Sequence, residues 1–191
     1  MKKILFIVLL FLTILVVNSF SFTEGYQGAI WGMSRDEVKK AFPDKKFQEA
    51  SGNLLFEDII LSDDAIIGFY FLKNQLYNVI IQLREVANID FPEIKSAGNK
   101  FNEVLEILKQ KYGTPSRLKN TINMEYIDDD FAIGTGQGSY FAVWKTQESE
   151  ITLLLTKMTG SKVALMVKYE NPYFASLHKK AEKQEAIENK F

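Results

Sequence analysis

The chain of 191 residues contains no cysteine and a single histidine. Without cysteine it cannot form a disulfide, a thiolate metal site, a cysteine nucleophile or a lipid-modified N-terminal cysteine. With one histidine it cannot build a site from two imidazoles of the same chain. The chain also lacks an excess of charge of one sign, since it has 23 Lys and Arg and 24 Asp and Glu. A nucleic-acid-binding domain is usually strongly basic. We therefore expect no nucleic-acid partner.

A long apolar run begins close to the N-terminus, where residues 4–17 follow the basic start Met1-Lys2-Lys3. Ser19 and Ser21 come next at alternate positions. This order is typical of a secretory signal peptide, and it predicts cleavage after Ser21 and a periplasmic or secreted protein. An uncleaved membrane anchor is the alternative, although the run is shorter than the roughly 20 residues that span a bilayer.

Removal of residues 1–21 would take away two lysines and change the formal charge from −1 to −3. It would leave 170 residues, a length at which a chain buries roughly 70 % of its surface on folding and can be stable without disulfides. We expect no stable membrane insertion of this remainder. The sequence does not indicate an oligomeric state.

Local patterns in the first half predict one helix followed by three strands. Ser34 and Glu37 have the spacing of a capping box, so a helix is expected from Ser34 to about Phe42, before Pro43. Strands are expected at residues 53–61, 65–72 and 75–84, with turns at 62–64 and 73–74. In the third strand the alternation places Tyr77, Val79, Ile81 and Leu83 on one face.

The second half repeats this order. An apolar stripe predicts a helix over residues 98–112, ended by Gly113. Strands are expected at 117–127, 139–146, 150–158 and 162–169. Asn171 and Pro172 then start a terminal helix whose inward side carries Phe174, Leu177 and Ala181.

These elements predict an α+β fold, with two helix-plus-antiparallel-meander units in one compact domain. The expected parts are a signal peptide at 1–21, units at 22–96 and 97–170, and a charged C-terminal helix at 171–191. Internal duplication is one interpretation of the repeated order. The other is that any chain of amphipathic helices and hairpins looks similar to itself.

The stretch 28–34, together with Glu37 and Val38, resembles an opening motif of uncharacterised exported bacterial proteins. The order of two helix-and-meander units resembles the tandem fold of β-lactamase-inhibitor proteins, and one unit resembles the small SmpA-like outer-membrane-assembly lipoproteins. The chain departs from both families because it has no cysteine for their disulfides or lipid anchor. The resemblance implies a non-enzymatic protein-binding module outside the cytoplasm.

Motifs that carry catalytic or metal chemistry are weak in this sequence. The aspartates at 128–130, followed by Gly134, Gly136 and Gly138, lack the ligand spacing of an EF-hand, so a solvated hairpin loop is favoured over a calcium site. His178 is expected to be solvent-exposed. The nucleophile motif Gly-x-Ser-x-Gly is absent from the sequence. We predict no catalytic residue, no metal and no cofactor.

The second face of the strands is the feature that bears most on function. It is semi-apolar and aromatic, whereas one face of an antiparallel sheet is usually polar. It is either covered within the fold or left open for a partner. If it is open, the chain is a soluble exported module that binds another envelope or secreted protein or a peptide. The alternatives are a carrier of a small molecule or lipid in an internal apolar pocket, and a hydrolase with an unrecognised site. The candidate partner-binding residues are Tyr70, Leu76, Ile80, Tyr140, Trp144, Leu154 and Met166.

Overall fold

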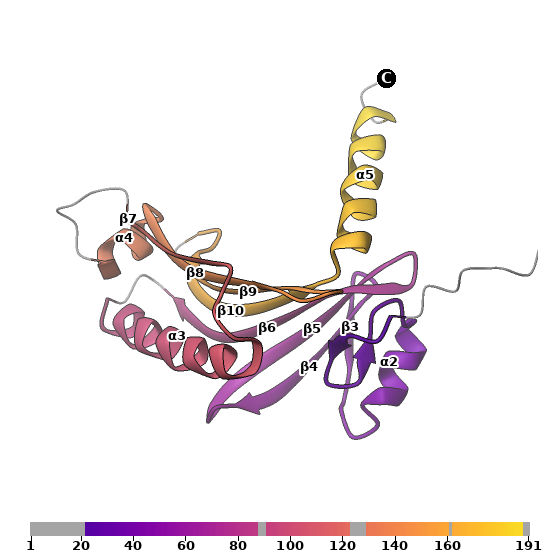
Figure 1. Cartoon of the computed structure of the whole chain (residues 1–191), viewed down its shortest axis with the longest axis horizontal. Coiled ribbons are helices and arrows are strands. Elements are labelled where there is room, and N and C mark those ends of the chain that lie inside the picture. The colour runs from indigo at the N-terminus through magenta and orange to yellow at the C-terminus, as the bar shows by residue number, and fades with distance from the viewer. Residues whose placement is uncertain (1–21, 88–90, 123–128, 161, 189–191) are drawn as a thin grey trace, which may run out of the picture.

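The computed structural model describes residues 22–87, 91–122, 129–160 and 162–188. Within these ranges the fold is α+β, as the sequence predicts, and is dominated by one eight-stranded antiparallel sheet (Figure 1). The expected signal peptide lies outside the described residues. The elements in chain order are β1 (Gly25–Tyr26), β2 (Ala29–Ile30), α2 (Arg35–Ala41), β3 (Gln48–Ala50), β4 (Asn53–Ile60), β5 (Asp63–Leu72), β6 (Gln75–Ala87), α3 (Phe91–Tyr112), β7 (Arg117–Ile122), α4 (Asp129–Thr135), β8 (Gly138–Lys145), β9 (Glu150–Lys157), β10 (Lys162–Glu170) and α5 (Pro172–Glu188).

The strand order shows how the two halves of the chain share this sheet. The order is β3-β4-β5-β6-β10-β9-β8-β7, so each half contributes one antiparallel meander. The last strands of the two meanders, β6 and β10, pair with each other in the middle. Each meander is preceded by a helix, α2 or α3. That these halves arose by duplication stays a prediction.

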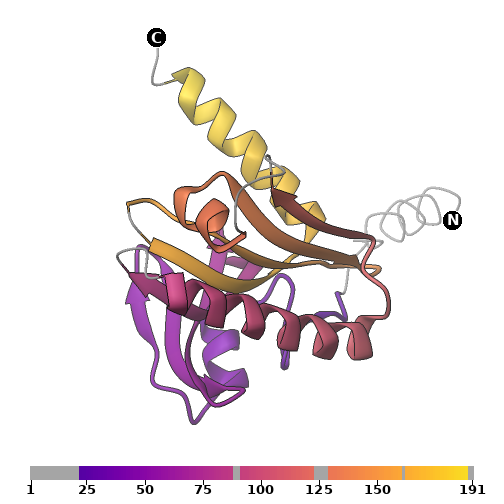
Figure 2. The same ribbon diagram turned by 90° about the vertical axis from the view of Figure 1, so that its left-hand side faces the viewer.

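The two faces of the sheet differ in what covers them. Figures 1 and 2 show α3 packed along one face, which we call the inner face, while α5 rises from the opposite side. Side chains of β5, β6, β9 and β10 alternate between this inner face and the opposite outer face. The inner face holds the core, including Phe69, Val79, Leu153 and Leu165, all 0 % exposed. Burial of this core is the main source of stability for a chain without disulfides.

Helix α2 begins as the capping motif predicts. The Glu37 amide donates to Ser34 Oγ at 3.4 Å, and the Ser34 amide donates to Glu37 Oε2 at 2.8 Å. These bonds satisfy two backbone donors at the helix start. The helix ends at Ala41 with Phe42 as its C-cap, close to the predicted end.

Helix α3 starts at Phe91, seven residues before the predicted Gly98. Pro92 lies in its first turn, where a proline nitrogen has no hydrogen-bond partner to lose. Ile94 and Ala97 are 0 % and 1 % exposed, so this added segment is part of the core. The predicted start was wrong because Gly98 was taken as a boundary.

The turn between β4 and β5 is shorter than predicted. Leu61 and Ser62 both have positive φ, 52° and 66°, as a two-residue type I′ turn requires. Asp63 and Asp64 therefore belong to β5 rather than to the turn. The predicted turn at Lys73 and Asn74 has the same form, with φ of 48° and 63°.

Part of the expected hairpin loop is a helix. Asp129–Thr135 forms α4, in which Ala132 and Ile133 are 1 % and 0 % exposed. This short apolar face packs against α3 and the neighbouring strands, and that tertiary contact overrides the weak local helix preference of a segment rich in glycine and aspartate. Asp128 and residues 123–127 of the predicted strand lie outside the described residues.

Helix α5 begins as expected but is less buried. The amides of Tyr173 and Phe174 donate to Asn171 Oδ1 at 3.1 and 3.2 Å, which makes Asn171 the N-cap. Of the predicted inward residues only Phe174 is buried, at 4 % exposed, because the helix leaves the body after its first turns (Figure 1). Leu177 is 36 % exposed, and Ala181 is also exposed.

His178 is less exposed than the sequence predicts, with 33 % of its side chain accessible. Its ring stacks on Tyr77 with centroids 5.1 Å apart. Its Nδ1 lies 3.3 Å from Glu182 Oε2, one helical turn further along α5. The side chain is half-buried, and it joins α5 to β6.

Candidate binding face

The sheet register brings apolar side chains from both halves of the chain into one row on the outer face. Ile66 on β5 lies opposite Gln82 on β6, and Gln82 lies opposite Met166 on β10. Met166 lies opposite Leu154 on β9, which in turn lies opposite Phe141 on β8. We call these five residues the outer row. Neighbouring strands are about 4.8 Å apart, so the outer row is about 19 Å long.

The outer row is accessible to a partner. Ile66 is 42 % exposed, and the other four side chains are half-buried. Four of the five are apolar, whereas the uncovered face of an antiparallel sheet normally carries polar side chains. Met166, Leu154 and Phe141 are consecutive in the row, and Gln82 separates them from Ile66. An apolar stripe on an uncovered sheet face is typical of an interaction site.

A second feature beside the outer row is the packing of Tyr70 on a glycine. A Cβ on Gly68 would come within 3.0 Å of Tyr70 Cε2 and 3.1 Å of its hydroxyl. The Tyr70 ring therefore lies along the sheet over Gly68, which is opposite Ile80 on the next strand. Partial burial raises the pKa of Tyr70, so the hydroxyl is neutral and can donate or accept a hydrogen bond.

Asn78 contributes a polar group to the same face. It lies opposite Tyr70 on β5 and Glu170 on β10, and it is 6 % exposed. Among the described residues its Oδ1 has no hydrogen-bond partner. A buried acceptor without a donor costs about 1–3 kcal/mol.

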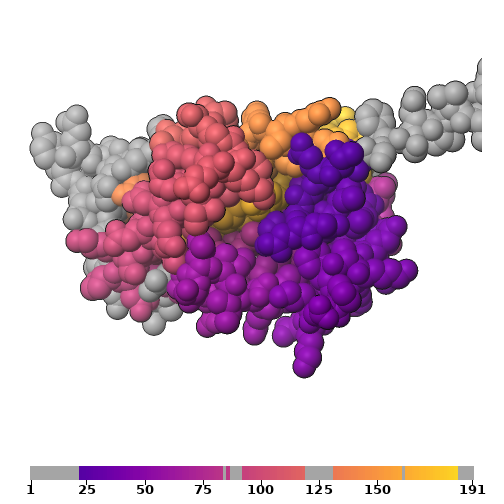
Figure 3. Space-filling model, turned by 60° about the horizontal axis from the view of Figure 1, so that its bottom comes forward, coloured from indigo at the N-terminus to yellow at the C-terminus, as the bar shows by residue number. Residues whose placement is uncertain are grey.

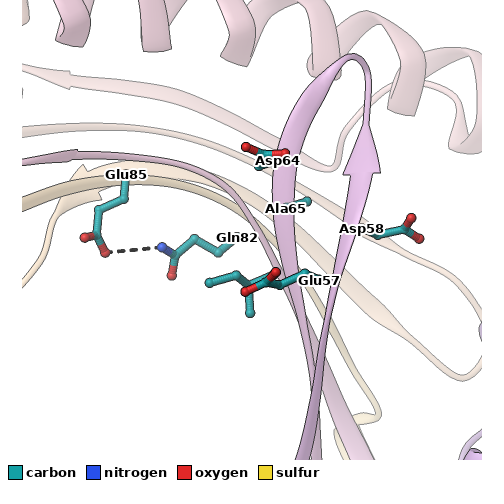
Figure 4. A pocket seen from close by; sticks show the side chains of 7 residues that line it. Glu57, Asp58, Asp64, Ala65, Gln82 and Glu85 are labelled. Carbon is teal, nitrogen blue, oxygen red and sulfur yellow. Dashed lines mark hydrogen bonds between the residues drawn. The ribbon is translucent and has the colours of Figure 1, made fainter. Parts of the chain in front are cut away.

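One end of the outer row opens into a pocket of about 490 Å³. Figure 4 shows Glu57 directed into it, with Gln82 donating to Glu85 at 3.2 Å. Asp58 points to the other side of β4 in this view. The residues that line the pocket are Glu57, Asp58, Asp64, Ala65, Ile66, Gln82 and Glu85.

The acids of this pocket differ in their partners. A hydrogen bond from Lys162, at 2.7 Å, is the main cause that lowers the pKa of Glu85. A hydrogen bond from Lys45, at 2.8 Å, likewise lowers the pKa of Asp58. Glu57 and Asp64 form no ion pair with any lysine or arginine whose side chain is described. The end of the outer row is therefore negatively charged.

The structure places four of the seven predicted residues on the outer face. These are Tyr70, Ile80, Leu154 and Met166, and each is half-buried. Sequence reasoning missed Ile66, Gln82 and Phe141. The apolar character of Ile66 and Phe141 was visible, but only the register shows that they continue the same row.

The other three predicted residues lie on the inner side, so their assignment to the second face is wrong. Leu76 is 0 % exposed, because Tyr77 is the extra residue of a β-bulge that reverses the alternation of β6. Trp144 is 2 % exposed, and its Nε1 donates to the Gly113 carbonyl at 2.8 Å. Tyr140 packs against Phe101 of α3, with ring centroids 5.6 Å apart. Strand β8 is apolar on both faces, so its sequence does not show which face is inward.

A smaller hollow lies on the helix side of the molecule, where Figure 3 shows a gap between α3 and the N-terminal segment. Its volume is about 320 Å³. Burial is the main cause that raises the pKa of Tyr169 in its wall, and a hydrogen bond with Tyr112 adds to the effect. Both hollows are open and carry charged residues, which does not favour an enclosed apolar carrier pocket. The residues lining the smaller hollow are Glu24, Gly25, Lys111, Tyr112, Thr146, Ser149, Ile151 and Tyr169.

Two further observations concern the part of the chain that the structure describes. Within it, no group of three or more His, Cys, Asp or Glu residues is placed to hold a metal ion. The helices described there are also too short or too polar to cross a membrane.

Comparisons of the chain with protein-family models, curated proteins and solved structures gave no match.

Proposed function

We propose that this protein is an exported, non-enzymatic module that binds a polypeptide segment on the outer face of its sheet. The observation that carries the proposal is the outer row, which crosses five strands and has four apolar members out of five. Such a surface gains free energy when it is covered, at roughly 25 cal/mol for each Å² of apolar area removed from water. Export is inferred from the N-terminal sequence pattern.

The chemistry around the outer row favours a segment with both apolar and cationic side chains. Glu57 and Asp64 at the pocket end would attract a lysine or arginine, and the chain without residues 1–21 has a formal charge of −3. The row length of about 19 Å matches about 13 residues of α-helix or about six residues of extended chain.

A capture experiment with matched variants tests this proposal. The chain without residues 1–21 is immobilised and exposed to a cell-envelope extract, and captured proteins are identified by mass spectrometry. The test variant is Tyr70→Ala with Met166→Ala, which removes two apolar groups from the outer face. The control is Leu118→Ser, because Leu118 is 56 % exposed on the edge strand β7 and lies outside the outer row.

The expected result is one captured protein that the control variant retains and the double variant loses. Raising the ionic strength should also weaken capture, since part of the attraction is charge on charge. Circular dichroism must show that the double variant is folded. Equal capture by the double variant and the control would contradict the proposed surface.

A further inference from the structure

The first described residues are held against the turn between β8 and β9. The Phe22 ring lies 5.3 Å from the ring of Phe174 at the start of α5. The amides of Thr23 and Glu24 both donate to Glu148 Oε2, at 2.9 and 2.8 Å. One carboxylate oxygen therefore accepts hydrogen bonds from the two backbone N–H groups that follow Phe22.

A second set of contacts joins the same segment to this turn through the Glu24 side chain. The Glu24 carboxylate accepts hydrogen bonds from Ser149 Oγ at 2.9 Å, from the Glu148 amide at 3.3 Å, and from Thr146 Oγ1. Ser149 Oγ accepts a hydrogen bond from Trp31 Nε1 at 2.9 Å, in a buried position. The backbone of residues 22–24 is thus positioned by groups more than 100 residues away in sequence.

We propose that the chain is cleaved between Ser21 and Phe22 and that the new α-ammonium group of Phe22 binds the carboxylate of Glu148. The cleavage half of this inference rests on the export proposed above. The exporting cell supplies a signal peptidase, and water is the co-reactant. Water adds its hydroxyl to the Ser21 carbonyl carbon and a hydrogen to the Phe22 nitrogen as the peptide bond breaks. The acid proton then passes to the amine, leaving a carboxylate and an ammonium.

Backbone geometry places the new charge close to its partner. The nitrogen of Phe22 is within about 4 Å of the Thr23 nitrogen, which itself lies 2.9 Å from Glu148 Oε2. Glu148 has no ion pair with a described cation. The bonds from the Thr23 and Glu24 amides to this carboxylate are already charge-assisted. A nearby ammonium adds the attraction of opposite charges, so cleavage strengthens the attachment of this segment.

The first measurement is the intact mass of the protein recovered from the envelope or medium of an exporting host. The expected mass is that of a chain starting at Phe22. A mass corresponding to another start would overturn the cleavage half of the inference.

The second measurement compares the melting temperature of a chain starting at Phe22 with that of the same chain acetylated at its N-terminus. Acetylation removes the charge and should lower the melting temperature by about 2 °C or more at pH 7. Glu148→Gln should abolish this difference. The control Glu150→Gln removes one charge from the next strand, where Glu150 pairs with Lys145 instead, and should retain it.

The pH dependence identifies the group responsible. An ammonium bound to a carboxylate has a pKa above the ordinary 7.7–8.0 of an α-amino group. Its stabilisation is therefore complete below pH 7.7 and is lost as pH rises through the higher folded-state pKa. The other titratable or charged groups on the elements packed here are Glu24, Lys111, Lys145, Glu148, Glu150, Tyr173 and His178.

The effect of acetylation should consequently shrink between pH 7.5 and 9.5 in the chain that carries Glu148. If acetylation has no effect at pH 7 in a chain shown by mass to start at Phe22, docking of the ammonium is overturned and cleavage stands. Neither result bears on the outer face, because capture is measured separately.

Discussion

Trp144 and Phe141 lie on the same strand, and we predict that truncating them has different effects. Trp144 is 2 % exposed on the inner side, where its indole N–H donates to the Gly113 carbonyl. Trp144→Ala leaves a large cavity in the core and an acceptor without its donor, at a cost of about 3–5 kcal/mol. Phe141 is half-buried on the outer face, so Phe141→Ala loses about 1 kcal/mol of burial free energy.

These costs correspond to measurable shifts. For a domain of this size, 1 kcal/mol changes the melting temperature by about 2–4 °C, so Trp144→Ala should lower it by about 6–20 °C and Phe141→Ala by about 2–4 °C. Urea unfolding followed by far-ultraviolet circular dichroism gives the same comparison as a free energy. Fluorescence is unsuitable, because Trp144 is one of only two tryptophans.

The capture experiment supplies the second half of this prediction. Phe141→Ala should weaken binding of the polypeptide partner although it changes stability little. Trp144→Phe is the control that keeps most of the ring volume and should affect stability through the lost hydrogen bond. If Phe141→Ala costs as much stability as Trp144→Ala, the assignment of inner and outer faces on β8 is refuted.

Three further predictions concern stability. Ser34→Ala removes the N-cap of α2 and should destabilise the chain by about 0.5–2 kcal/mol in urea unfolding. Burial raises the pKa of Tyr26 to about 12. The stability that the neutral hydroxyl contributes is therefore present below pH 10 and lost as the pH rises to about 12. Tyr26→Phe should make the melting temperature less sensitive to pH in this range. Gly113 has φ of +79° at the end of α3, and Gly113→Ala should cost about 1 kcal/mol, measured by thermal unfolding.

Local elements could be predicted from the sequence because short-range contacts determine them. The capping box at Ser34, the turn at Lys73 and Asn74, and the end of α3 at Gly113 each depend on residues within one turn of chain. The α+β class follows from their order. Helix α4 could not be predicted, since a segment of seven residues is helical only where Ala132 and Ile133 find a core to pack against.

The candidate site was only partly predictable. The sequence showed that the second face is apolar and named Tyr70, Ile80, Leu154 and Met166 correctly as members of that face. The predicted facing of Leu76 was wrong, because no local sequence pattern indicates the bulge that makes Tyr77 the extra residue. A single inserted residue reverses the facing of the side chains before it.

The sequence by itself determined the composition of the core, the positions of most helices and strands, and the exclusion of disulfide and thiolate chemistry. Tertiary structure decided which side of each strand faces the helices. It also decided that Ile66 of one meander and Phe141 of the other lie in one row, through the pairing of β6 with β10. The physical reason is that side-chain facing and cross-strand neighbours are set by register between distant segments, whereas periodicity along one strand is the same for either face.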